Sequence, residues 1–137
     1  MVESILHKFF VKTIKEWILS FCSEEMIILC DSENSFFSKD IPPKIDSYIP
    51  DVFAFGRISK KIVIGEAKTS QIDLESEHTE RQIIAYLKHC LKKKDSIFVL
   101  VVPLYLVNCG KSLLSYLKVE NGCEAVKTHV TNPLLLN

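Results

Sequence analysis

The amino-acid sequence predicts a layered α/β fold in which helices flank a mixed sheet of four to five strands. Helically spaced apolar residues open the chain, apolar runs of strand length follow them, and helical segments alternate with the later runs. A buried strand that follows a helix implies a crossover connection, which is typical of parallel strands. The chain has 137 residues, of which 47% are hydrophobic, so it can form a single domain over 1–137 whose core needs no disulfide bonds.

A helix, a short strand and a loop are predicted first. Over 2–21 the apolar residues follow helical spacing and lysines occupy the other side, which is typical of an amphipathic helix. The run Met-Ile-Ile-Leu-Cys over 26–30 has the length and composition of a buried strand. Ser, Asp and Asn and a Pro42-Pro43 pair are concentrated over 31–47, so we expect a mobile loop there.

A β-hairpin is predicted next. Its first apolar strand covers 49–55, its turn 56–60 and its second apolar strand 61–68. Side chains alternate along a strand, so Glu66 and Lys68 point to the same face, roughly 7 Å apart. Charged groups that are buried without partners lose much of their favourable hydration. A divalent cation would compensate the acids, because Mg²⁺ prefers oxygen ligands and keeps several waters. The candidate ligands are Asp51, Glu66 and a backbone carbonyl, for which we take that of Ala67.

The rest of the chain is predicted to alternate helices and strands. A polar connection over 69–77 leads into a helix over 77–94. The continuous β-branched run over 96–103 is typical of a central strand that is covered on both faces. A helix over 111–118 and a strand over 125–130 complete the order α-β-β-β-α-β-α-β.

The hairpin carries two motifs, Pro50-Asp51 near its start and Glu66-Ala67-Lys68 at its end. Together with the core order α-β-β-β-α-β, these motifs resemble the signature of the PD-(D/E)xK nuclease superfamily. That resemblance implies a three-layer, restriction-endonuclease-like core. It also implies that Asp51 and Glu66 bind one or two Mg²⁺ ions, for which Mn²⁺ can substitute, and that Lys68 positions or activates the attacking water. Such a metal lowers the pKa of its water and stabilises the charge that develops on the phosphate.

Gln82 and Tyr86 lie four residues apart in the second predicted helix and therefore share a face. This QxxxY pattern resembles the one that RecB-type and related nucleases carry after the ExK strand, where it lines the active site and contacts the DNA backbone. The alternative is an amphipathic helix whose core stripe contains Ile83 and Leu87, with Gln82 and Tyr86 at its edge.

The resemblance further implies an acid from the first helix, and two glutamates compete for that role. At about 100° per residue, Glu3 falls near the middle of the apolar arc, whereas Glu16 lies at its margin. We favour Glu3, although a carboxylate in the first helical turn is also stabilised by the helix dipole alone. Glu16 stays open because the spacing from this acid to the first strand is usually shorter in the family.

Basic residues on the second predicted helix are the candidate DNA contacts. Seventeen Lys and Arg residues balance seventeen Asp and Glu residues, so the chain lacks an overall basic excess and any DNA contact must be local. Phosphate binding needs charge but no base reading. The candidates are Arg81, Lys88, Lys92, Lys93 and Lys94. The alternative is a solvated face whose lysines suit the helix dipole.

Other site types are not favoured by the sequence. The lysines of the first helix fit neither a signal peptide nor a membrane span, so a cytoplasmic protein is expected. Cys109-Gly110-Lys111-Ser112 ends like a P-loop, but Tyr105 replaces the upstream glycine, which argues against a nucleotide cofactor. The five cysteines lack CxxC spacing and are expected to be buried thiols. The histidines show no ligand spacing and are expected to be structural or exposed: His7, His78, His89 and His129.

These observations predict a Mg²⁺-dependent deoxyribonuclease of the resolvase-like or RecB type. Its minimal size matches stand-alone nucleases encoded by viruses or mobile elements, and such small enzymes often form dimers to cut two strands. The rival hypothesis is a non-catalytic DNA-binding or assembly subunit that retains the fold, although its motif residues would be expected to decay. A third hypothesis is an α/β domain with chance acids. The geometry of the substrate, and the choice between DNA and RNA, stay open.

Overall fold

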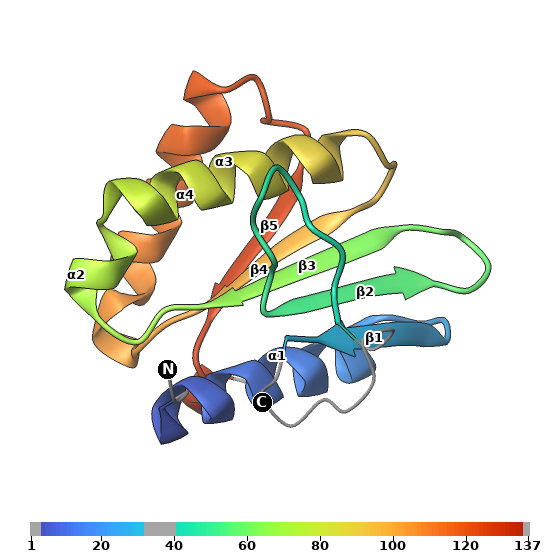
Figure 1. Cartoon of the computed structure of the whole chain (residues 1–137), viewed down its shortest axis with the longest axis horizontal. Helices are drawn as coiled ribbons and strands as arrows, with labels where there is room; N and C mark the ends of the chain where they lie inside the picture. Colours follow the sequence, from blue (N-terminus) through green and yellow to red (C-terminus); the bar gives the residue numbers. More distant parts are fainter. Residues whose placement is uncertain (1–3, 32–40, 136–137) are drawn as a thin grey trace.

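A five-stranded mixed sheet forms the centre of the structure, a computed structural model that describes residues 4–31 and 41–135 (Figure 1). Its strands lie in the order β1-β2-β3-β4-β5. Neighbours from β1 to β3 pair antiparallel, whereas β3, β4 and β5 pair parallel. The bounds are β1 Met26–Cys30, β2 Val52–Gly56, β3 Ile62–Ala67, β4 Ile97–Val101 and β5 Lys127–Thr131. The predicted α/β fold with a mixed sheet is confirmed.

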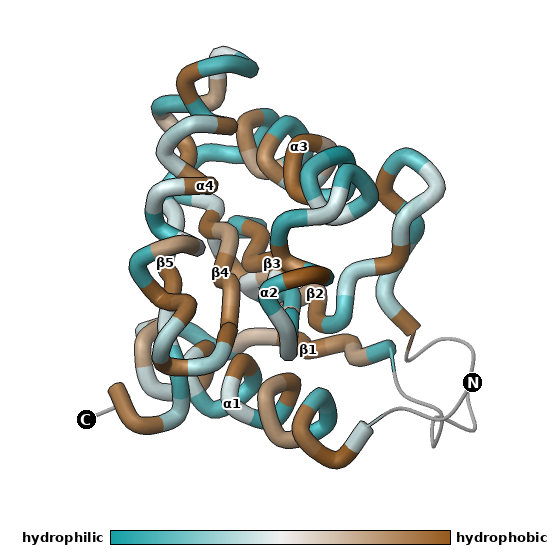
Figure 2. Tube along the Cα trace, turned by 90° about the vertical axis from the view of Figure 1, so that its left-hand side faces the viewer, coloured by the Kyte–Doolittle hydropathy of each residue, from teal (hydrophilic) through white to brown (hydrophobic). Residues whose placement is uncertain are grey.

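Helices cover both faces of the sheet and give the fold three layers, which Figure 2 shows from the side. Helix α1 packs on one face, against apolar side chains that include Val63 and Val99. Helices α3 and α4 cover the opposite face, against side chains that include Ile64 and Leu100. Because side chains alternate along a strand, odd and even residues of β3 and β4 contact different helices. The helix bounds are α1 Ile5–Phe21, α3 Glu77–Leu91 and α4 Val107–Glu120.

Helices α3 and α4 are crossover connections between parallel strands. Helix α3 joins β3 to β4 and α4 joins β4 to β5, so each returns the chain from the end of one strand to the start of the next. All residues of the central strand β4 are buried, as its continuous apolar run predicts. The ends of β3, β4 and β5 therefore lie at one edge of the sheet, which we call the carboxyl edge. Their starts lie at the opposite, amino edge.

Close packing of α1 on β3 depends on one glycine. The helix begins after Ser4, whose hydroxyl accepts a hydrogen bond from the N–H of His7 at 3.0 Å. It was predicted from residue 2, and residues 1–3 lie outside the described residues. Farther along, Ile14 is fully buried over Gly65. A Cβ at Gly65 would collide with the Ile14 side chain, so the glycine permits the close approach of α1 to the sheet.

Helices α3 and α4 have bounds that differ from the predicted ones, and α4 also ends at Glu120 rather than 118. Helix α3 ends at Leu91 rather than 94, because the chain must reverse before it enters β4, and Asp95 in this turn has φ 63°. Helix α4 begins at Val107 rather than 111, since a 3₁₀ turn over Leu104–Leu106 leads directly into it. Length and composition indicated both helices correctly, but their ends are set by the connections.

The predicted polar connection over 69–77 contains a short helix, α2, over Gln71–Leu74. Its N-cap is Ser70, and Leu74 is buried, which anchors the segment to the core. Four strands are shorter than predicted. They are β2, expected over 49–55, β3, expected over 61–68, β4, expected over 96–103, and β5, expected over 125–130.

Part of the loop predicted over 31–47 is anchored to the core, whereas residues 32–40 lie outside the described residues. The described part passes over the face of the sheet that carries α3 (Figure 1). Ile45 is buried in the same cluster as Phe53. Its backbone pairs with that of Tyr48 through hydrogen bonds of 2.7 and 3.0 Å. The loop is thus held at this point against the face of the sheet that carries α3.

The cysteines agree only in part with the sequence-based expectation. Among the described residues they form no disulfide bond. Cys90 and Cys123 are buried, as expected, whereas Cys109 is exposed on α4. Separately, no helix in the described ranges combines the length and the apolar composition that a membrane span requires.

Candidate active site

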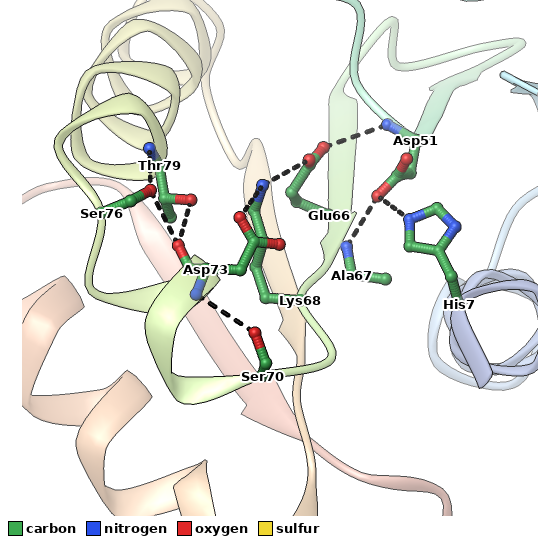
Figure 3. Close-up of polar contacts among 9 residues, drawn as sticks. All are labelled: His7, Asp51, Glu66, Ala67, Lys68, Ser70, Asp73, Ser76 and Thr79. Atoms are coloured by element: carbon green, nitrogen blue, oxygen red, sulfur yellow. Dashed lines mark hydrogen bonds and ion pairs between the residues drawn. The ribbon is translucent and has the colours of Figure 1, made fainter. Parts of the chain in front are cut away.

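Two acidic residues meet at the carboxyl edge, where β2 begins and β3 ends (Figure 3). Strands β2 and β3 are antiparallel, and Val52 pairs with Gly65. The residue that precedes β2, Asp51, therefore lies across from Glu66. The backbone N–H of Asp51 donates a hydrogen bond to Oε1 of Glu66 at 3.1 Å. The hairpin thus brings together the two acids that the sequence singled out.

The Asp51 carboxylate is held from two sides. Its Oδ2 accepts a hydrogen bond from the N–H of Ala67 at 2.8 Å and lies 3.2 Å from Nε2 of His7 (Figure 3). The Asp51 side chain is only 12% exposed. Among residues 4–31 and 41–135, no hydrogen bond reaches its other oxygen, Oδ1. That oxygen is therefore available to a ligand.

Lys68 places a buried ammonium beside Glu66. Its backbone N–H donates to the carbonyl of Val101 at 3.0 Å, which continues the pairing of β3 with β4 past the end of the strand. Its Nζ lies 3.5 Å from Oε2 of Glu66 and 3.9 Å from Oδ1 of Asp73 (Figure 3). The expectation that Glu66 and Lys68 share a face of the sheet agrees with this contact.

The surroundings hold the pKa of Glu66 well above its usual range. Burial is the largest cause, because it removes water from the carboxylate, and the negative charge of Asp51 adds to the rise. The Lys68 ammonium and the Asp51 N–H act in the opposite direction without cancelling it. A further positive charge beside the two carboxylates would favour the ionised form of Glu66. The pair is therefore electrostatically suited to binding a cation.

Helix α3 brings two buried polar side chains, Gln82 and Tyr86, to the same side of the sheet as Glu66. Tyr86 packs on Phe98, with ring centroids 6.0 Å apart. Within the described part of the chain, neither the Tyr86 hydroxyl nor Oε1 of Gln82 has a hydrogen-bond partner. Burial raises the pKa of Tyr86, and the charge of Glu66 adds to the rise. Buried polar groups without partners are rare, so these atoms are candidates for contact with a ligand.

The donor set fits Mg²⁺. It offers carboxylate oxygens from Asp51 and Glu66. The carbonyl of Ala67 adds a third oxygen on the Asp51 side, because the N–H and C=O of a strand residue point the same way. No three His, Cys, Asp or Glu side chains converge on one point in the described residues. Mg²⁺ is commonly held by one or two carboxylates together with waters and phosphate oxygens, so two carboxylates suffice.

Helix α1 contributes a histidine to the site. His7, in the first turn, reaches the Asp51 carboxylate (Figure 3). Glu3, the glutamate favoured from the sequence, lies outside the described residues. Glu16 is exposed and lines a groove beside His129, more than two helical turns from His7. The structure therefore does not bring Glu16 to the two acids of the hairpin.

Sequence reasoning missed His7 and Asp73. His7 was set aside because the histidines lack ligand spacing, yet it lies on α1, the helix from which the resemblance implies an acid. Asp73 lies in a segment that was predicted to be a polar connection. The signal that could have found it is the Ser70-Gln71-Ile72-Asp73 pattern, in which Ser70 caps a short helix and so fixes the aspartate near Lys68.

The predicted phosphate contacts are spread along α3 and beyond its end. Arg81 is exposed on the first half of α3 and pairs with Glu77 at 3.4 Å. Lys88 is exposed farther along the helix, and the lysines at 92–94 follow its last residue. Helix α3 has 15 residues, so about 20 Å separates its ends. The lysines at 92–94 therefore lie toward the amino edge, opposite Asp51.

No protein-family model matches the chain, and neither a curated protein nor a solved structure matches it. The interpretation of the site therefore depends on the contacts of its own residues. Among these, the hydrogen bond between Asp51 and Glu66 and the ion pair between Glu66 and Lys68 carry the most weight.

Proposed function

We propose that the protein is a metal-dependent deoxyribonuclease that hydrolyses DNA phosphodiester bonds in the manner of the PD-(D/E)xK superfamily. The observation that carries the proposal is the convergence of two buried carboxylates and a buried ammonium at the carboxyl edge of the sheet. Asp51, Glu66 and Lys68 are 8%, 4% and 6% exposed. Acidic side chains without a functional role are usually exposed to solvent, because burying a charge without compensation is costly. A cluster of this kind therefore favours a functional origin.

The Asp51 and Glu66 carboxylates, with the Ala67 carbonyl, would hold Mg²⁺, for which Mn²⁺ can substitute. A bound ion of this kind supplies Lewis-acid chemistry, since it activates water and neutralises charge that develops on the phosphate. The raised pKa of Glu66 supports the assignment, because a nearby cation would stabilise its ionised form. The hydrogen bonds of His7 and Ala67 to Asp51 fix that carboxylate in advance.

Lys68 would orient the attacking water and offset negative charge on the scissile phosphate. Its ammonium has three donors, and the carboxylates of Glu66 and Asp73 lie next to it. The contact with Asp73 is an ion pair at 3.9 Å, longer than a hydrogen bond, so donors of the ammonium remain for the substrate. The Tyr86 hydroxyl would donate to a neighbouring phosphate oxygen. Oε1 of Gln82, which can only accept, would face a donor such as an active-site water, because both atoms lack partners among the described residues.

Basic residues along α3 would bind DNA phosphates away from the reacting one. The chain has a net charge of zero, so these contacts act locally rather than through a long-range field. Arg81 and Lys88 lie along the helix, and the lysines at 92–94 extend the contact toward the amino edge. We further propose a cytoplasmic enzyme, where thiols such as Cys109 stay reduced, and a dimer that would cut both strands.

Cleavage of supercoiled plasmid and of a branched DNA junction, each with Mg²⁺ or Mn²⁺, tests the proposal. Asp51→Asn and Lys68→Ala should abolish cleavage. Matched control variants are Glu25→Gln and Arg57→Ala, which remove charges of the same signs from an exposed ion pair of 3.3 Å that is outside the proposed DNA contacts. Both controls should cut at the wild-type rate. Circular dichroism and thermal unfolding would show that each variant folds.

Two outcomes would contradict the proposal. Cleavage by Asp51→Asn at the wild-type rate would remove this residue from the reaction and point to a contaminating nuclease. DNA binding without cleavage by the wild type, over single-stranded, duplex and branched DNA and both metals, would favour a non-catalytic DNA-binding or assembly subunit.

A further inference from the structure

A third carboxylate, outside the sequence motif, lies beside Lys68. Figure 3 shows the Lys68 ammonium between Glu66 and Asp73, with Nζ 3.5 Å from Oε2 of Glu66 and 3.9 Å from Oδ1 of Asp73. The Glu66 side chain is 5% exposed, whereas that of Asp73 is 48% exposed. Lys68 thus has one acidic partner inside the site and one at its rim.

Hydroxyl groups around α2 set the position of Asp73. Its N–H donates to the Ser70 hydroxyl at 3.2 Å. Its carbonyl accepts hydrogen bonds from the hydroxyls of Ser76 at 2.9 Å and Thr79 at 2.6 Å, and Thr79 is fully buried (Figure 3). A helix as short as α2 is not stable by itself, so these bonds hold the segment where its aspartate meets Lys68.

The two acidic partners of Lys68 differ in what else they do. Glu66 belongs to the proposed ligand set, and a carboxylate that binds a cation attracts a neighbouring ammonium less strongly, because its charge is shared. Asp73 is outside the proposed ligand set, so its negative charge would not be shared with the cation and would attract Lys68 at full strength. Without Asp73, Glu66 would be the one acidic side chain among the described residues that still pairs with Lys68, and its attraction would be weakened.

We propose that Asp73 is a positioning residue, which holds the Lys68 ammonium beside the carboxylates of Asp51 and Glu66 during the reaction. This inference rests on the proposed nuclease function and adds a residue that contacts neither the metal nor the substrate. It makes Ser70 and Thr79 part of the support of the site, since they fix the backbone of Asp73.

Steady-state cleavage of a fluorescent DNA junction with Mg²⁺ tests the role of Asp73. Asp73→Asn should lower kcat by about 10- to 100-fold and change KM less than about twofold, because misplacing a reacting group affects chemistry more than binding. Asp73→Glu restores a carboxylate and should recover part of the rate. The matched control is Glu75→Gln, which removes an equal charge from an exposed residue next to α2 that pairs with Gln71. This control should behave as the wild type.

A measurement independent of cleavage follows the Lys68 side chain itself. The order parameter of its ε-methylene, from ¹³C relaxation with Mg²⁺ present, should fall in Asp73→Asn and stay unchanged in Glu75→Gln. Thermal unfolding should differ little between the two variants, because both side chains are at least partly exposed. A general loss of structure would instead lower order in other side chains as well.

The two measurements separate failure of this inference from failure of the proposed function. If the wild type cleaves DNA but Asp73→Asn has the kcat of Glu75→Gln, the inference is overturned and the nuclease assignment stands. If the wild type cleaves nothing, the nuclease assignment fails. In that case the order parameter of the Lys68 ε-methylene alone tests whether Asp73 positions Lys68. An order parameter in Asp73→Asn equal to that of the wild type would overturn the positioning role.

Discussion

The backbone of Asp51 binds the side chain of Glu66: the Asp51 N–H donates a hydrogen bond to Oε1 of Glu66 at 3.1 Å. A second bond, from the N–H of Ala67 to Oδ2 of Asp51 at 2.8 Å, runs the other way across the hairpin. The two acids are therefore fixed in register by the same strands that bury them. Their closeness has measurable consequences for stability as well as for activity.

The stability of the metal-free protein should fall as pH rises, because the pKa of Glu66 lies above its ordinary value of 4.5. The folded protein then holds this proton more tightly than the unfolded chain. The stabilisation is fully present below pH 4.5 and is lost as pH rises through the folded-state pKa. Urea unfolding at a series of pH values should show a decline of up to about 1.4 kcal/mol per pH unit, which Glu66→Gln should reduce.

Glu124→Gln, at an exposed position, is the control for that measurement and should keep the wild-type pH profile. Added Mg²⁺ should restore stability near neutral pH in the wild type, since a ligand that binds only the folded state stabilises it. A pH profile that Glu66→Gln leaves unchanged would show that other groups cause the decline.

Gly65→Ala should destabilise the fold, because the new Cβ would collide with the Ile14 side chain on α1. Overpacking of this kind costs about 1–3 kcal/mol, measurable by chemical unfolding. Ile14→Ala alone should also destabilise, through the cavity it leaves. The double variant should be more stable than the sum of the two effects implies, since each change relieves the other. Simple additivity would contradict the packing of Gly65 against Ile14.

Tyr86→Phe should leave stability unchanged or raise it by about 1 kcal/mol, because the hydroxyl it removes is buried without a partner among the described residues. The ring would keep its contact with Phe98. Cleavage of DNA should nevertheless slow, since the hydroxyl would contact the substrate. Thermal unfolding and plasmid nicking, measured on the same preparation, check the two parts. A clear loss of stability would show that the hydroxyl has a partner in the folded protein.

Cys109 should react first with a thiol reagent under native conditions, because it is exposed on α4. Burial raises the pKa of Cys90 to about 12, so little of that thiol is ionised near neutral pH. The reaction of Ellman's reagent should therefore show a fast phase that Cys109→Ser removes. Cys123→Ser should leave the fast phase intact, since Cys123 is buried. A fast phase that survives Cys109→Ser would contradict the exposure of this thiol.

The contact between Glu66 and Lys68 could be predicted, because the alternation of side chains along a strand is a local property. A period of two residues places Glu66 and Lys68 on one face whatever the rest of the chain does. The register of the hairpin was not predicted as closely. Strands over 49–55 and 61–68 would set Asp51 opposite Gly65, whereas Phe55 pairs with Ile62 and thereby sets Asp51 opposite Glu66. The mixed sheet was predictable for a similar reason, since the lengths of the connections determine which strands can pair parallel.

The contacts of His7 and Asp73 could not be predicted in the same way, because they join elements that only tertiary packing brings together. His7 reaches the hairpin from α1, and Asp73 reaches Lys68 from α2. The direction of a helix matters as well. The lysines at 92–94 follow α3 in sequence, but a crossover helix carries its last turn away from the edge where the preceding strand ends.

If the protein binds DNA as proposed, the length of α3 would set a lower limit on the footprint of the substrate. Its 15 residues span about 20 Å, which corresponds to about six base pairs at 3.4 Å per step. An oligonucleotide that binds both the carboxylates and the lysines at 92–94 must exceed this size. Shorter duplexes would contact the carboxylates but not the lysines at 92–94. The affinity for DNA should therefore rise sharply once the duplex is longer than this footprint.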